Sequence, residues 1–168
     1  MERQDDGTTG KLLRGAFAGI VAGVTASLAM DLFQSATSAL SSSGGDEESE
    51  PATEKAADRI AEALTGSELA PADKPIAGQG VHYAFGMALG IAYGIAAEFR
   101  PTVTAGYGTA FGVGSATLFD EGFVPAAGLG EKPWKAGLAG NLYAYASHLV
   151  FGVTSELVRR QVVKTLEP

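Results

Sequence analysis

The sequence predicts an all-α fold: a four-helix transmembrane bundle made of two tandem helical hairpins, with a short amphipathic helix in an outer loop. Three observations lead to this prediction. Only 18% of the 168 residues are charged, against about 25% in a typical soluble domain. Charges are absent from four runs near the length that crosses a hydrocarbon core, and these runs resemble one another in pairs. The alternative is a water-soluble Gly/Ala-rich domain, but four such runs are hard to bury in one small core.

The predicted spans cover residues 12–39, 76–98, 102–120 and 135–158 of a single integral membrane domain, 1–168. The charge-free part of the first span, Gly15 to Met30, is short on its own, so its helix must continue beyond Asp31. The third span is the weakest, because glycine costs up to about 1 kcal/mol in a helix interior and this span holds several. We still expect a helix there, because lipid leaves an unpaired backbone unsatisfied.

The loop at residues 41–75 is predicted to be acidic and extracytoplasmic. It begins with a flexible acidic linker that is rich in Ser and Gly. From Thr53 to Leu64 apolar residues then recur at helical spacing, with acids on the opposite side. This pattern predicts a short surface helix with Thr53 as its N-cap and Gly66 as its stop.

Basic residues give the orientation. They flank the predicted spans on the side opposite the acidic loop, at Lys11, Arg14, Arg100, Arg159, Arg160 and Lys164. By the positive-inside rule, the N- and C-termini are expected on the cytoplasmic side and the acidic loop outside.

The chain also repeats itself. The first and third spans align at an offset of 89 residues, which places Asp31 on Asp120, and the second and fourth share His-x-x-Phe-Gly at His82 and His148. Parallel repeats of this kind occur in transporters. Small residues at a spacing of four let helix backbones approach closely and favour a homo-oligomer or a larger membrane complex. The glycines of these rows that we assign to helix packing are Gly15, Gly19, Gly23, Gly86, Gly90, Gly94, Gly108, Gly112 and Gly152.

Polar residues within the spans are the candidate functional residues, because ionisable groups are expensive in a membrane. They are Asp31, His82, Asp120, Asn141 and His148. For Asp120 the sequence favours a place at the membrane interface, because Gly122 and Pro125 follow it. Glu98 and Glu156, near the inner ends, are expected to pair with neighbouring arginines.

Three chemistries fit these candidates. The aspartates and histidines could move protons or cations, or respond to external pH, since histidine titrates near pH 6.5. His82, His148 and Asp31 could instead bind a divalent metal, or the two histidines could hold a haem. Against both cofactors, the histidines are predicted at depths that differ by roughly 9 Å, at 1.5 Å per helical residue. Whether they meet in space decides between these readings.

Other classes of function are disfavoured. The net charge of −7 argues against a nucleic-acid partner. The absence of cysteine removes disulfides and thiolate sites. The sequence contains no serine-nucleophile motif, phosphate loop or dinucleotide fingerprint, so a non-enzymatic role is favoured, including that of a structural subunit in a membrane complex.

From Gly15 to Val163 the chain resembles the YagU-like family of small bacterial inner-membrane proteins. The resemblance rests on Met30-Asp31-Leu32, on His82-Tyr83, on the run from Gly130 to Trp134, and on His148 followed by Gly152. It implies a multi-span protein of the bacterial inner membrane, with the lipid bilayer as its environment. The family's molecular function is uncharacterised, so the resemblance supplies no catalytic residue.

Overall fold

The structure is a computed structural model that describes residues 7–40 and 50–166, and all regular structure in these ranges is helical. The all-α prediction is therefore confirmed. The start of the predicted acidic linker, 41–49, lies outside the described residues. The helices are α1 (Thr8–Leu40), α2 (Ala52–Thr65), α3 (Lys74–Phe99), the 3₁₀ turn η1 (Pro101–Thr104), α4 (Thr109–Ser115), the π-helix η2 (Ala116–Phe123), α5 (Val124–Ala126) and α6 (Pro133–Leu166).

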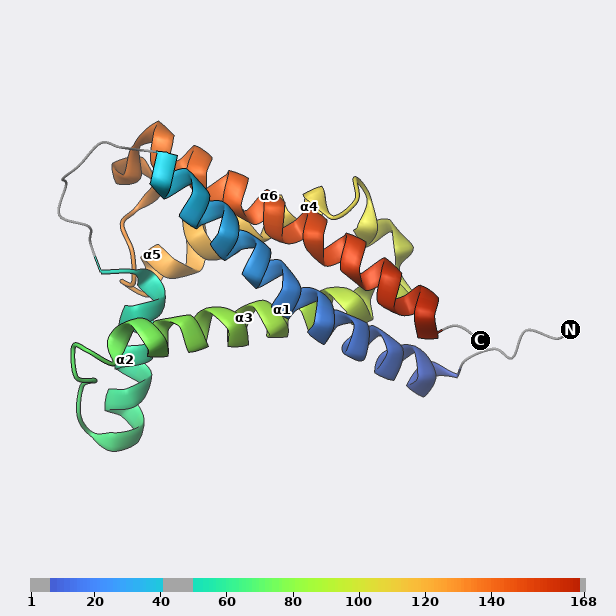
Figure 1. Cartoon of the computed structure of the whole chain (residues 1–168), viewed down its shortest axis with the longest axis horizontal. Coiled ribbons are helices and arrows are strands. Elements are labelled where there is room, and N and C mark those ends of the chain that lie inside the picture. Colours follow the sequence, from blue (N-terminus) through green and yellow to red (C-terminus); the bar gives the residue numbers. More distant parts are fainter. Residues whose placement is uncertain (1–6, 41–49, 167–168) are drawn as a thin grey trace, which may run out of the picture.

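Helices α1 and α3 form an antiparallel hairpin (Figure 1). Their backbones nearly touch at glycines. A Cβ placed on Gly15 would lie 2.8 Å from the carbonyl oxygen of Gly94. Gly19 meets Gly90 and Gly23 meets Gly86 in the same manner. Each of these positions therefore has no room for a side chain, and the three contacts lie one helical turn apart.

The second hairpin joins α4 to α6 through the same kind of contact. Gly108 lies against the backbone of Gly152, and Gly112 against the carbonyl of His148. In the first hairpin Gly19 and Gly23 face Gly90 and Gly86. An offset of 89 residues therefore superposes the contact glycines of α1 on those of α4. In the partner helices, however, the residue of α3 that occupies the same packing position as His148 is Gly86, not His82. The shared His-x-x-Phe-Gly motif is thus one helical turn out of register with the packing.

The third helical segment differs from its predicted start at residue 102. Gly106, Tyr107 and Gly108 adopt positive φ angles of 67°, 54° and 84°, so a continuous helix begins only at Thr109. The segment then continues past Asp120 through η2 and α5 to Ala126. A π-helix accommodates Pro125, because the wider turn relieves the clash between a proline ring and the carbonyl four residues earlier. The sequence predicted that this span ends at residue 120, before Gly122 and Pro125. The helical structure instead continues past both residues.

Helix α6 contains a break near its beginning. Gly137 has φ 72° and ψ 170°, which separates the first turn at Pro133 from the long helix that follows. The amide of Asn141 donates a hydrogen bond of 3.1 Å to the carbonyl of Pro133 across this break.

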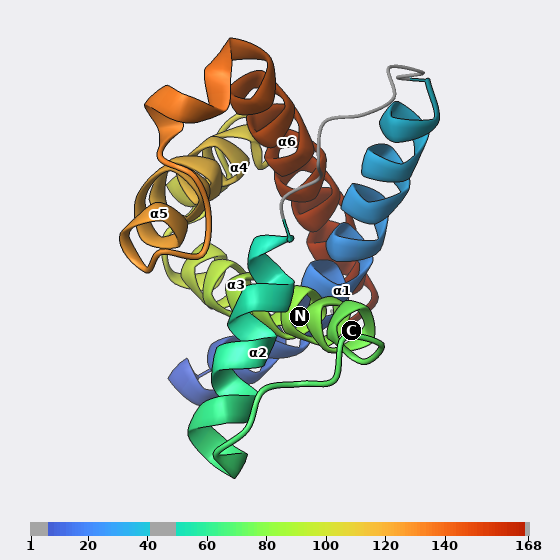
Figure 2. The same ribbon diagram turned by 90° about the vertical axis from the view of Figure 1, so that its left-hand side faces the viewer.

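Contacts between the hairpins close a ring of helices (Figure 2). On one side α1 packs against α6, and both helices bury small side chains there, among them Ala22, Ala26 and Ser147. On the other side aromatic rings join α3 to the third segment. The ring centroids of Phe85 and Phe119 are 4.7 Å apart, and those of Tyr93 and Phe111 are 4.2 Å apart.

Helix α2 is the short helix expected in the outer loop, and it packs on α3 near its N-terminus. It starts after Pro51 rather than at the predicted cap Thr53, and it ends at Gly66, whose φ of 78° gives a left-handed C-cap. The side chain of Arg59 donates hydrogen bonds to the carbonyls of Ala127 and Gly128. Helix α2 is therefore anchored both to α3 and to the segment that follows α5.

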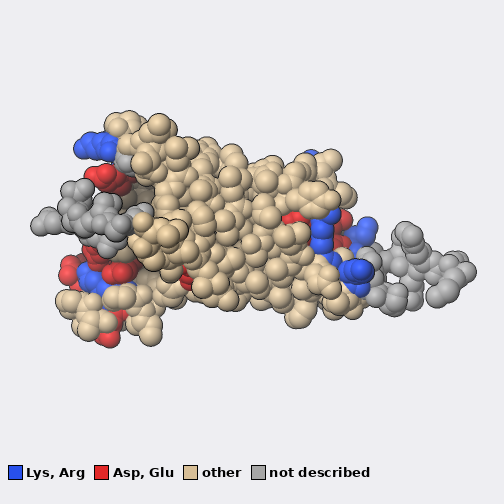
Figure 3. Space-filling model, turned by 45° about the horizontal axis from the view of Figure 1, so that its top comes forward, with Lys and Arg blue, Asp and Glu red and all other residues tan. Residues whose placement is uncertain are grey.

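The pattern of burial is inverted relative to a water-soluble domain. The largest side chains with almost no exposure are Glu156 and three serines, whereas the face of α1 that carries Leu13, Phe17 and Leu28 is exposed. Figure 3 shows a broad belt without charged side chains between two charged ends. Helices α1 and α3 are each long and apolar enough to cross a membrane.

Candidate functional site

A cavity of about 460 Å³ lies between the helices, toward the end of the molecule that carries α2. Its walls come from α1, α2, α3, η2, α5 and α6, so both hairpins contribute. Four of the five predicted candidate residues line it: Asp31, His82, Asp120 and His148. The structure therefore brings together residues that are far apart in the sequence.

The first hairpin supplies a histidine–aspartate pair to this cavity. Nε2 of His82 lies 3.2 Å from Oδ1 of Asp31, within ion-pair distance. That nitrogen is buried and its geometry toward the carboxylate is not that of a hydrogen bond. The other oxygen of Asp31 accepts a hydrogen bond of 2.6 Å from the Gln79 amide. Asp31 is thus held by Gln79, while the imidazole lies beside it.

The second hairpin supplies an equivalent pair. Nδ1 of His148 lies 3.2 Å from Oδ2 of Asp120 and 3.1 Å from the carbonyl oxygen of Ala144. Because both neighbours of Nδ1 are acceptors when Asp120 is ionised, this nitrogen carries the proton of the neutral ring. The π-helix η2 contains Asp120, and such widened turns often occur at functional sites. The structure places Asp120 on the cavity wall, and its predicted place at the membrane interface stays a prediction.

Both histidines reach the same cavity. The packing register places His148 opposite Gly112 and one helical turn along α6 from the position equivalent to His82. The predicted depth difference of roughly 9 Å, at 1.5 Å per helical residue, therefore does not keep the two side chains out of a common cavity.

Asn141 lies apart from this site. Its hydrogen bond to Pro133 belongs to the break in α6, and it is not among the residues that line the cavity. Within 7–40 and 50–166, no group of three or more His, Cys, Asp or Glu side chains is arranged to hold a metal ion. The two pairs therefore do not form a group of three or more such side chains.

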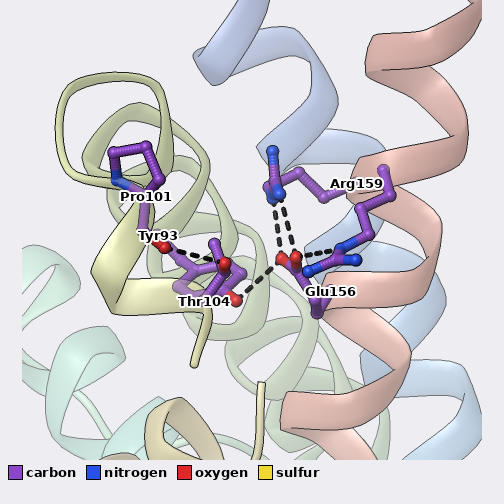
Figure 4. A network of polar contacts seen from close by, with 6 residues as sticks. Tyr93, Pro101, Thr104, Glu156 and Arg159 are labelled. Carbon is purple, nitrogen blue, oxygen red and sulfur yellow. Dashed lines mark hydrogen bonds and ion pairs between the residues drawn. The ribbon is translucent and has the colours of Figure 1, made fainter. Parts of the chain in front are cut away.

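A second polar cluster lies at the opposite end of the molecule (Figure 4). Glu156 is fully buried and accepts hydrogen bonds from Tyr93, at 2.8 Å, and from Arg159, at 2.8 and 2.9 Å. Arg160 pairs with the same carboxylate. The sequence predicted that Glu156 pairs with neighbouring arginines, and Arg159 and Arg160 are those partners. It missed Tyr93, because only folding brings α3 beside α6.

Glu98 has a different partner from those expected. Arg14 donates hydrogen bonds of 2.6 and 3.1 Å to its carboxylate, so this ion pair joins α1 to α3. The pairing follows from the glycine contacts, since the antiparallel register that joins Gly15 to Gly94 places Arg14 beside Glu98. This ion pair thus fixes the first hairpin at this end of the molecule, whereas the ion pairs of Glu156 lie within α6.

The fold and the site define a class: an all-helical protein with two helices able to cross a membrane and an internal cavity with histidine–aspartate pairs. The chain belongs to the family described as "Protein of unknown function (DUF1440)", whose model matches residues 60–157. This match includes His82, Asp120 and His148, but not Asp31. No curated protein and no solved structure matches the chain significantly. The narrower YagU-like resemblance stays a prediction.

Proposed function

We propose that this is a four-span protein of the bacterial inner membrane that takes up protons at its two histidine–aspartate pairs. It would thereby move protons or cations, or respond to external acid. The observation that carries the proposal is that both pairs line one cavity. Ionisable groups within membrane helices are rare and usually serve function.

The belt of apolar side chains supports the membrane location. A soluble protein would bury its large apolar residues, but here most buried positions are glycine, alanine or serine, and many leucines are exposed, although Phe151 is buried. Close packing of small residues is how helices associate where lipid removes the hydrophobic driving force. The glycine contacts in both hairpins support this role for the predicted glycine rows.

The distribution of charge supports the orientation. The N-terminal end of α1, the C-terminal end of α6 and the turn at η1 lie at the same end of the molecule (Figure 1). Arg14, Arg100 and Arg159 are close to these points in the sequence. Helix α2, whose side chains include Glu54, lies at the other end. By the positive-inside rule the cavity would then face the extracytoplasmic side, where a fall in external pH reaches it first.

Proton flux into liposomes tests the proposal. With an inward proton gradient, the wild-type protein should conduct protons, and Asp31→Asn and Asp120→Asn should each reduce the flux by about tenfold, the effect of roughly 1.4 kcal/mol. Gly80→Ala is a matched control, because a Cβ at Gly80 meets nothing within 4 Å. Equal flux in all variants would contradict the proposal. The proposal would also be contradicted if the wild-type protein conducts no protons and the hydrogen exchange of amides around the cavity does not change with pH.

A further inference from the structure

The charge of the cavity wall is one-sided. Asp31, Asp120 and Glu54 line the cavity, and none of the described residues on its wall is Lys or Arg. Besides the two histidines, the ionisable side chains of the wall are these three carboxylic acids. A cavity with low-dielectric walls and charges of one sign concentrates ions of the opposite sign. The wall therefore favours a cation.

The remainder of the wall is aromatic and apolar. Phe85, Phe119, Phe123 and Phe151 all line the cavity. Phe85 and Phe119 meet edge to face, with an interplanar angle of 86°. Aromatic rings attract cations through their negative faces, and they recognise quaternary ammonium groups in particular. Phenylalanine is not a metal ligand, so these residues point to an organic cation.

The size and donor set also argue for an organic ligand. A volume of about 460 Å³ is that of a small-molecule pocket, much larger than a bare ion requires. Within the described ranges no three potential ligands converge on one point. The two aspartates come from different hairpins, so a ligand between them would contact both halves of the molecule.

We infer that this cavity binds an organic cation with one positive charge and an apolar body, the charge facing Asp31 and Asp120 and the body against the phenylalanines. The inference rests on the proposed function, because it assigns a ligand class to the same cavity. The match between one-sided charge, aromatic wall and volume carries it.

Protons should compete with this ligand. Each aspartate lies beside a histidine, and a protonated imidazole would neutralise its charge. The titratable groups that face the pairs are the carboxylate of Glu54 on α2, the phenol of Tyr83 on α3 and the carboxylate of Glu121 on η2. None of these three groups can carry a positive charge, so none competes with the cation for the aspartates. Acid should therefore weaken binding of the cation, and binding should release protons.

Isothermal titration calorimetry with benzyltrimethylammonium on the full-length protein in detergent tests the inference. We expect saturable binding at pH 7.5 that weakens by about tenfold at pH 5, since one lost charge interaction of roughly 1.4 kcal/mol is tenfold. Asp31→Asn and Asp120→Asn should each weaken binding by about the same factor. Phe119→Leu keeps an apolar wall but removes one aromatic face, so it should weaken binding of the cation and not that of benzyl alcohol, the neutral comparison.

Three results would overturn the inference. These are absence of binding at millimolar concentration, binding of benzyl alcohol as tight as that of the cation, and binding of the cation that the aspartate variants leave unchanged. Melting temperatures of the variants establish that they are folded. The proton-flux assay separates the two proposals. Intact, aspartate-dependent flux without cation binding would refute only this inference, whereas loss of both would refute the proposed function as well.

Discussion

At the scale of single residues, Glu156 stands out among the described residues as a fully buried ionisable side chain outside the cavity. It has no exposed surface and is held by two arginines and a tyrosine. A buried carboxylate is stable only when its partners satisfy it, because its desolvation is otherwise uncompensated. Glu156 therefore fixes the relation between α3 and α6 rather than taking part in the cavity chemistry.

Substitution of Glu156 tests this role. Glu156→Gln leaves the buried guanidinium of Arg159 uncompensated and should destabilise the protein by about 3–5 kcal/mol, the usual range for a broken buried pair. Tyr93→Phe removes one hydrogen bond and should cost only about 1 kcal/mol. Thermal unfolding in detergent measures both changes. If the two variants melt at the same temperature as wild type, the cluster is not structural.

At the scale of helices, close glycine contacts set the geometry of each hairpin. Gly19→Ala would push a methyl group into the backbone of Gly90, and overpacking of this kind costs about 1–3 kcal/mol. Gly80→Ala, on the same hairpin but with open space at its Cβ, should be neutral or stabilise α3 by about 0.5–1 kcal/mol. Unfolding measured side by side compares them, and equal melting temperatures would contradict the packing account.

Helix α2 is anchored through Asp58, a carboxylate whose pKa is lowered. The Lys74 ammonium, which donates a hydrogen bond of 2.8 Å to Asp58, holds the pKa of Asp58 below its ordinary value, with help from the backbone N–H of Leu69. A lowered pKa gives stability that is present above the ordinary value and is lost only as pH falls through the lowered one. The docking of α2 through Asp58 should therefore persist at pH 5.

Hydrogen exchange checks this prediction. Protection of the Leu69 amide should be unchanged between pH 7 and pH 5, after correction for the intrinsic rate, and should fall at both pH values in Asp58→Asn. Loss of protection in the wild type over this pH range would show that α2 itself responds to acid. The response to pH would then not be confined to the histidine–aspartate pairs.

Helix existence was predictable because hydrophobic runs and missing charges act locally. Another local signal, apolar residues at helical spacing with acids opposite, predicted the short helix α2 and its stop at Gly66. Helix boundaries were not predictable from the sequence. The breaks at Gly106–Gly108 and Gly137 depend on positive φ angles, which glycine permits but does not require. The continuation through Asp120 depended on a π-helix, which no spacing in the sequence reveals.

The candidate site was predictable in composition but not in arrangement. Asp31, His82, Asp120 and His148 were identifiable because polar residues are costly within apolar runs. Their pairing required the register of each hairpin, and their shared cavity required the packing of one hairpin on the other. Asn141 passed the same sequence test, yet its partner is the broken turn at Pro133, a feature that only the folded backbone creates.

At the scale of the whole molecule, the topology has a direct test, because the chain contains no native cysteine. Ser67→Cys lies in the connection between α2 and α3, and Thr165→Cys lies near the end of α6. A membrane-impermeant maleimide should label Ser67→Cys in intact cells with the outer barrier permeabilised. It should label Thr165→Cys only after the inner membrane is opened. The reverse pattern would invert the proposed orientation and turn the cavity toward the cytoplasm.

The central claim is that two histidine–aspartate pairs in one cavity bind protons within the membrane. The chain has only two histidines, so ¹⁵N NMR of protein labelled at histidine in bilayers gives two assignable side-chain signals. Spectra are compared between pH 8 and pH 5, and the account expects the protonated forms of both side chains to appear on acidification. Asp31→Asn should make His82 harder to protonate and leave His148 nearly unchanged, and Asp120→Asn should do the reverse. The account would be contradicted if both histidines stay neutral throughout this range. It would also be contradicted if their protonation is the same in wild type, Asp31→Asn and Asp120→Asn.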